Sequence, residues 1–255
     1  MKNIYKLIIF IFMGFILCIC PAMADSAIPN IIISPKIIEI GTFFSGGDIT
    51  ISGEIPMNDD IVIEVSGHDS KNEFDIKGKK GILWMTIGQV HIDRVPELYI
   101  LLLPPGENWG EKIESLGVGM GQLKSRMQAE SSIAVPPDIF NMFIKFKESE
   151  SLYGEKLKAI KYLPMDNGKK KFTIICKLPS SIKKGKYTIK ATTISKNIVK
   201  TSITKNFSVE EVGFIKLVDH LASDRRILYG VSAVVIALIA GLGMGIVFKQ
   251  SGGSH

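Results

Sequence analysis

The chain has 255 residues, 46% of them hydrophobic, and carries a formal net charge of +6. This length allows one large or two small domains between the two apolar ends of the chain. A small disulfide-stabilised scaffold is excluded, because two of the three cysteines lie in the N-terminal apolar segment and only Cys176 remains.

The positive charge is confined to one part of the chain. Residues 25–153 hold 11 basic and 19 acidic residues, a net of −8, whereas residues 154–206 hold 14 lysines and two acidic residues, a net of +12. These lysines are not interleaved with stacking aromatic residues, so nucleic acid is not an expected partner. Two interpretations stay open: the basic block neutralises the acidic half, or it faces anionic lipid headgroups or a partner. The candidates for such a face are Lys169, Lys170, Lys171, Lys183, Lys184 and Lys186.

The N-terminal apolar segment has the pattern of a cleaved secretory signal. Two lysines precede the uncharged run 7–19, and the small residues Ala22 and Ala24 form a cleavage site. We therefore expect a signal peptide at residues 1–24 and a mature chain that begins at Asp25. A lipoprotein signal is the less favoured alternative, because each cysteine in this segment follows a large aliphatic residue.

A second apolar segment, residues 228–248, carries no charge and is long enough to cross a hydrocarbon core of roughly 30 Å. Residues 211–227 form an amphipathic juxtamembrane segment before it, and residues 249–255 form a short cytoplasmic tail. We expect the chain to cross the bacterial cytoplasmic (inner) membrane once, with its N-terminal domain in the periplasm. Gly241 and Gly245 form a small-xxx-small face on which another helix can pack closely.

Most of the exported part has the pattern of short β-strands. Alternating apolar residues and frequent turn signals predict antiparallel strands in residues 25–105, an acidic N-terminal region. Residues 154–210, the basic C-terminal region, repeat the pattern around a hairpin signal at 166–168. The expected fold is mainly β, an antiparallel immunoglobulin-like β-sandwich present as one large or two small sandwiches. The predicted strands are 31–33, 36–40, 48–54, 60–65, 73–77, 82–90, 97–103, 157–163, 170–177, 186–194 and 198–209.

Residues 106–153 form a helical insertion between these β regions. Apolar residues recur at helical spacing from Trp109 to Met127, and glycines within 117–121 break this stripe. A second stripe begins at Ile139 after two prolines, which suit the first turn of a helix. We expect these helices to cover an edge or a face of the sheet, and an apolar groove for a partner is the alternative.

No catalytic motif occurs in the sequence. His91 and Asp93 face the same way on a predicted strand, but two ligands are too few for a structural metal site. Cys176 follows two isoleucines and fits a small core residue. We therefore expect no cofactor, no metal and no enzymatic activity. The alternative is an extracytoplasmic hydrolase or metal-dependent enzyme with an unrecognised site.

Several short motifs occur in a characteristic order along the chain. They are Ile37–Ile40, Phe43-Phe44-x-Gly46-x-Asp48-Ile49, Ile51-Ser52-Gly53, Asp60-Ile61-Val62, Ile82-Leu83-Trp84, Leu178-Pro179, Gly185-Lys186-Tyr187 and Val212-Gly213-Phe214. In this order they resemble a family of transmembrane proteins of unknown activity first described from alphaproteobacteria. The resemblance implies a signal peptide, a β-rich exported domain and a C-terminal anchor, without catalytic residues.

The same resemblance implies an association with an anion exporter of the sulfite or organosulfonate type. Together with the residues, it predicts a membrane-anchored periplasmic binding or assembly protein. We expect this protein to be an accessory subunit of a transporter or envelope complex, with membrane lipid and a membrane protein as its partners.

Overall fold

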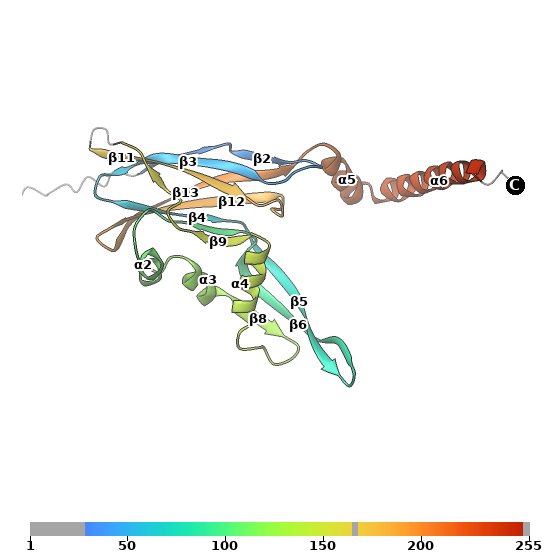
Figure 1. Ribbon diagram of the computed structural model, residues 1–255, viewed down its shortest axis with the longest axis horizontal. Helices are drawn as coiled ribbons and strands as arrows, with labels where there is room; N and C mark the ends of the chain where they lie inside the picture. The colour runs from blue at the N-terminus through green and yellow to red at the C-terminus, as the bar shows by residue number, and fades with distance from the viewer. Residues whose placement is uncertain (1–28, 165–167, 252–255) are drawn as a thin grey trace, which may run out of the picture.

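The computed structural model describes residues 29–164 and 168–251 (Figure 1). The predicted signal peptide, the centre of the predicted 166–168 turn and the end of the tail lie outside the described residues. Strands dominate the described part, which confirms the predicted mainly β class. The finer expectation of an immunoglobulin-like sandwich stays a prediction.

The first sheet, sheet A, joins strands from both β-rich regions of the sequence. Its order is β1-β3-β11-β10, and all of its pairs are antiparallel. The longest pairing runs between β3 and β11, which lie more than a hundred residues apart in the chain. The strands are β1 (Asn30–Ser34), β3 (Gly47–Pro56), β10 (Lys161–Tyr162) and β11 (Lys169–Leu178).

The second sheet, sheet B, also combines the two regions. Its order is β2-β13-β12-β4-β7-β9, in which the outer pairs β2–β13 and β7–β9 are parallel and the inner pairs are antiparallel. The acidic and basic regions are therefore interleaved within both sheets. The strands are β2 (Ile37–Ile40), β4 (Asp60–Ser66), β7 (Tyr99–Leu102), β9 (Tyr153–Lys156), β12 (Gly185–Ser195) and β13 (Ile198–Glu211).

Sheets A and B form two layers with the main core between them (Figure 1). Alternate residues of β3 and β11 point into this core, as the period of two requires. Gly53 lacks a side chain where the Phe172 ring lies, and a Cβ atom there would come within 2.9 Å of that ring. Buried side chains from the two layers include Ile49, Ile51, Ile174, Ile61, Ile63, Tyr187 and Ile189.

Helices α2 (Trp109–Ser115), α3 (Met120–Arg126) and α4 (Ile139–Ser149) lie on the side of sheet B away from sheet A (Figure 1). The predicted break between the first two helices is present, and Gly117 and Gly119 both have positive φ there. Met127, which the apolar spacing placed on the helix, is extended and leads into a strand that was not predicted.

Two further differences concern short strands. The predicted strand 157–163 is wrong for most of its length, because only Lys161–Tyr162 pairs with β11. The neighbouring segment Tyr153–Lys156 forms β9 instead and extends the edge of sheet B beside β7. Both segments are strands because a neighbouring edge offers them hydrogen bonds, which local sequence does not show.

Strands β5 (Asp69–Lys80) and β6 (Leu83–Pro96) form a long hairpin that projects from the two-layered body (Figure 1). Near its base, β6 also pairs with β8 (Gln128–Ser131), which completes a small third sheet. The hairpin continues from the end of β4 and returns to the start of β7. It therefore leaves the body at one defined end of sheet B.

The C-terminal end carries α5 (Gly213–Asp224) and α6 (Arg226–Ser251). The ammonium group of Lys184 lies 3.3 Å from the carboxylate of Glu211 at the end of β13 and also contacts Asp219 on α5. These contacts connect α5 to the body. Helix α6 is the one helix in the described part of the chain that is long and apolar enough to cross a membrane.

Candidate functional site

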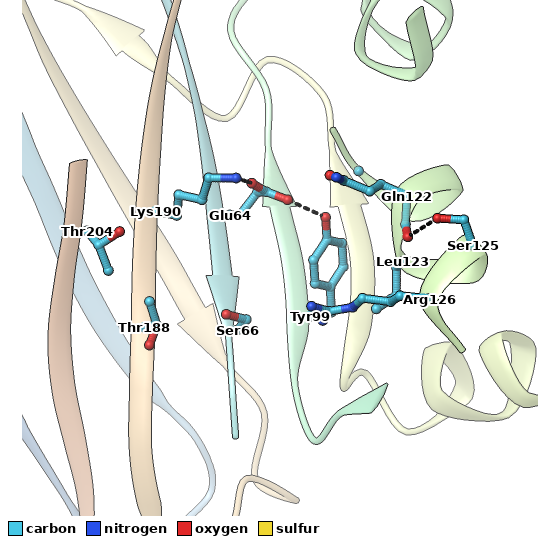
Figure 2. Close-up of a pocket in the computed structure, with 11 residues that line it drawn as sticks. Glu64, Ser66, Tyr99, Gln122, Leu123, Ser125, Arg126, Thr188, Lys190 and Thr204 are labelled. Atoms are coloured by element: carbon cyan, nitrogen blue, oxygen red, sulfur yellow. Dashed lines mark hydrogen bonds and ion pairs between the residues drawn. The ribbon is translucent and has the colours of Figure 1, made fainter. Parts of the chain in front are cut away.

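A polar pocket of about 350 Å³ opens beside α3 on the helix-covered side of sheet B (Figure 2). Strands β4, β7, β12 and β13 and helix α3 contribute its lining. The polar side chains around it include Glu64, Tyr99, Gln122, Arg126, Thr188 and Lys190.

Glu64 is the buried acid of this pocket, with 8% of its surface exposed. It stands directly opposite Lys190 in the antiparallel β4–β12 register, and the Lys190 ammonium lies 3.2 Å from Glu64 Oε2. Neighbouring strands bring such cross-strand pairs within contact distance on one face of a sheet. Lys190 therefore compensates a carboxylate that would be costly to bury alone.

Tyr99 forms a hydrogen bond with the other carboxylate oxygen of Glu64. Its hydroxyl group donates a hydrogen bond of 2.6 Å to Glu64 Oε1. Burial, followed by the negative charge of Glu64, raises the pKa of the Tyr99 phenol well above its usual value. The phenol thus stays protonated and acts as a donor at any physiological pH.

Arg126 adds a second positive charge to the lining. It lies in the last turn of α3, and its guanidinium group is 3.8 Å from Asp69 at the start of β5. Both side chains are about half exposed, so solvent screens this ion pair strongly. The guanidinium group keeps donor capacity toward anything that enters the pocket.

The charges of the lining indicate which kind of ligand the pocket can bind. Among the lining residues, the two cationic side chains Lys190 and Arg126 outnumber the one carboxylate, Glu64, and Asp69 outside the lining pairs only weakly with Arg126. Hydroxyl groups of Ser66 and Thr188 offer additional neutral hydrogen bonds. This set fits a small anion, or a carboxylate from a partner, better than a cation.

One comparison with known proteins decides the family. The model of the family described as "Putative transmembrane protein (Alph_Pro_TM)" matches residues 30–250. The chain belongs to this family. A comparison with curated proteins gives no match. The predicted resemblance is therefore confirmed, and membership agrees with a single-pass membrane protein whose spanning helix is α6.

In this Alph_Pro_TM protein, the first three candidate lysines face carboxylates of the acidic half. Lys169 and Lys171 lie 4.0 and 3.9 Å from Glu54, and Lys170 lies 3.4 Å from Asp60. All three begin β11, at the end of the body opposite to α5, because β11 pairs antiparallel with β3. The structure therefore does not bring them beside the membrane helix (Figure 1).

The other three candidates lie near the membrane helix. Lys183 is 3.2 Å from Glu97, Lys184 contacts the end of β13 and α5, and Lys186 is the second residue of β12. The Alph_Pro_TM chain thus divides its basic block between two ends of the domain. The predicted attraction to anionic lipid stays a prediction, and only Lys183, Lys184 and Lys186 stand where such a surface would be.

The remaining candidates do not line the pocket. A Cβ atom added at Gly241 or Gly245 would meet no atom within 4 Å, so that face of α6 is open. His91 is exposed and Asp93 half-buried on β6. Across residues 29–164 and 168–251, no three His, Cys, Asp or Glu side chains gather closely enough to hold a metal ion.

Sequence reasoning did not identify the pocket residues. One signal was available, because Glu64 interrupts the apolar run of β4 at a position where neighbours on both sides are buried. Lys190 similarly interrupts β12. Their pairing depends on the β4–β12 register, which no local pattern shows.

Proposed function

We propose that this chain is a single-pass accessory protein of the cytoplasmic membrane, with its β domain in the periplasm, that assembles with a second membrane protein. The observation that carries the proposal is the exposure of α6, because none of the residues in its apolar window is buried by the rest of the described chain. Because the described residues leave its apolar window exposed, α6 is free to pack against another helix within the lipid.

The open face of α6 supports such packing. Gly241 and Gly245 lie one turn apart, and Ala237 and Gly230 fall on the same side at about 100° per residue. In lipid, helices associate through close van der Waals contact, which small residues permit. The partner is a membrane protein, for which the anion exporter implied by the family resemblance is our first candidate.

The polar pocket supports a binding role for the exported domain. Its excess positive charge would suit an anionic group carried by the partner or by a solute that the complex handles. Lys190 forms an ion pair with the buried carboxylate and Tyr99 donates a hydrogen bond to Oε1, whereas Oε2 accepts no hydrogen bond from the described residues, so this lining has donor and acceptor capacity for binding.

The test is crosslinking in membranes, followed by purification in mild detergent and identification of what is captured. The double variant Gly241→Leu/Gly245→Leu should reach the membrane at normal levels but lose its partner. Gly243→Leu is the matched control, because Gly243 is also open and lies about 200° around the helix from Gly241. If the double variant is crosslinked as strongly as the parent and this control, assembly does not use the glycine face.

A further inference from the structure

The end of the β5–β6 hairpin is strongly apolar and exposed. Ile82, Leu83 and Trp84 have 92%, 65% and 73% of their surfaces exposed, and Met85 follows them. Large apolar side chains gathered at one projecting point are unusual on a soluble surface and mark a contact with a partner or a membrane. We name residues Ile82–Met85 the hairpin tip.

The hairpin tip makes no contribution to the core of the domain. The base of the hairpin is well supported, since Phe74 packs edge-on against Phe143 and Phe146 at 5.7 and 5.5 Å between ring centroids. Pairing with β8 ends at Val90. Gln89 still accepts a hydrogen bond from the Ser132 backbone, and from Lys77–Thr86 to Lys80–Leu83 the two strands pair only with each other within the described residues. The apolar residues at the tip are therefore not explained by folding.

Positive charge lies directly behind the tip. Lys79 and Lys80 precede it, and within residues 29–164 and 168–251 no ion pair joins either of them to a carboxylate. Tryptophan favours the headgroup level of a bilayer, and nearby lysines are attracted to anionic lipids by about 1 kcal/mol each. The apolar residues of the tip suit the headgroup level of a bilayer, and the lysines beside them suit anionic lipid headgroups.

The strand order places the hairpin at the same end of the body as the membrane helix. The end of β4 faces Thr188 near the start of β12, and Gly185 at that start faces Val209 near the end of β13. The hairpin leaves from β4 and α5 leaves from β13, so both depart from the same end of sheet B with β12 between them. Figure 1 shows the hairpin inclined toward the end where α6 begins.

The lengths of α5 and of the β5–β6 hairpin allow α6 and the hairpin tip to contact the same membrane surface. Helix α5 has 12 residues and spans about 18 Å between the body and α6. Strand β5 also has 12 residues but reaches about 40 Å, because a strand rises further per residue. Even an inclined hairpin is therefore long enough to reach the plane where α6 enters the lipid.

From these observations we propose that the hairpin tip inserts into the headgroup region of the membrane face from which α6 emerges, with Lys79 and Lys80 at anionic phosphates. The occupant is the lipid bilayer itself. The chain would then be attached at two points, the spanning helix and the tip. This inference does not depend on the helix pairing proposed for α6, and the two can fail separately.

The experiment uses the full chain in vesicles of equimolar phosphatidylcholine and phosphatidylglycerol, with and without brominated acyl chains that quench tryptophan. The chain has two tryptophans, of which Trp84 is at the tip and Trp109 is buried. Both leaflets carry the quencher, so the orientation of the reconstituted chain does not matter. Brominated lipid should remove about half of the total emission of the parent, and Trp84→Phe should abolish that loss.

Lys79→Gln/Lys80→Gln tests the contribution of charge. This variant should lower the quenching of Trp84, and Lys71→Gln at the hairpin base should leave it unchanged. Equal quenching in the parent and in Trp84→Phe, or no quenching in either, would overturn the proposal. Protection of Trp84 from an aqueous quencher in native membranes but not in lipid vesicles would also overturn it, in favour of a protein partner.

Discussion

Tyr99→Phe tests whether the buried carboxylate in the pocket depends on the Tyr99 phenol. The substitution removes only the hydroxyl group, whose hydrogen bond to Glu64 is 2.6 Å long and lies between two side chains exposed by 5% and 8%. Hydrogen bonds to charged groups contribute about 1.5–3 kcal/mol, so we expect the free energy of unfolding to fall by about 2 kcal/mol. Lys190 alone does not replace the phenol, because its side chain is 42% exposed and solvent weakens its ion pair.

The neighbouring strand provides a matched control. Tyr153 stands opposite Tyr99 in the β7–β9 register, is equally buried, and donates a hydrogen bond of the same length to the carbonyl oxygen of Pro96. Its acceptor is neutral, so Tyr153→Phe should cost only about 1 kcal/mol. Urea unfolding in mild detergent, followed by the fluorescence of the buried Trp109, measures both variants.

A double-mutant cycle then isolates the charge. In a Glu64→Gln background the acceptor oxygen is kept but the charge is lost, so Tyr99→Phe should cost about 1 kcal/mol there, a coupling of roughly 1 kcal/mol. Tyr153→Phe should show no coupling to Glu64→Gln. Equal costs for the two tyrosine variants, or zero coupling at Tyr99, would refute this account of the pocket.

Two further predictions concern the core. Burial raises the pKa of the Cys176 thiol to about 11 from 9.0, so at neutral pH the native thiol should react with maleimide about 100-fold more slowly than a free cysteine. The unfolded chain ionises first as pH rises, so stability should fall by about 2 kcal/mol more between pH 9 and 11 in the parent than in Cys176→Ala. Gly53→Ala should cost about 2 kcal/mol in denaturant unfolding, because its Cβ would collide with the Asn30 carbonyl and the Phe172 ring. Gly154→Ala, which has open space, should change stability by less than about 0.5 kcal/mol, and equal effects at the two glycines would contradict this reasoning.

The sequence predicted those elements whose local pattern is strong. β4 carries the apolar run Ile61–Ile63 followed by Val65, β12 has apolar residues at every second position from Tyr187 to Ala191, and both are strands. The glycine-rich break between α2 and α3 was also recognisable, because positive φ at Gly117 and Gly119 ends a helix. Met127 shows the limit of this reasoning, since a buried residue one turn after Leu123 satisfies the helical spacing and yet is extended.

What could not be predicted depends on contacts between distant segments. β9 contains Gly154, Glu155 and Lys156 and becomes a strand only because the edge of β7 is available. The pocket required knowing that β4 lies between β12 and β7, which brings Glu64 to both Lys190 and Tyr99. Lys170 and Lys183 face carboxylates of the acidic half, and these pairings between distant segments could not be read from the sequence.

The interleaving of early and late strands has a consequence for how the domain is made. β2 pairs with residues 208–211, and one edge of β3 pairs with β11. These edges have no hydrogen-bond partner until the later residues have been made. A chain is made from its N-terminus, so sheet A is completed only after β11 has been made and sheet B only after β13, and α5 alone separates β13 from α6. β1 and β4 meet β3 and β7 early, but β2 and the second edge of β4 lack their partners until most of the chain has been made. Sheet B is therefore completed just before the membrane-capable helix α6 is made, which couples the last step of folding to the synthesis of that helix.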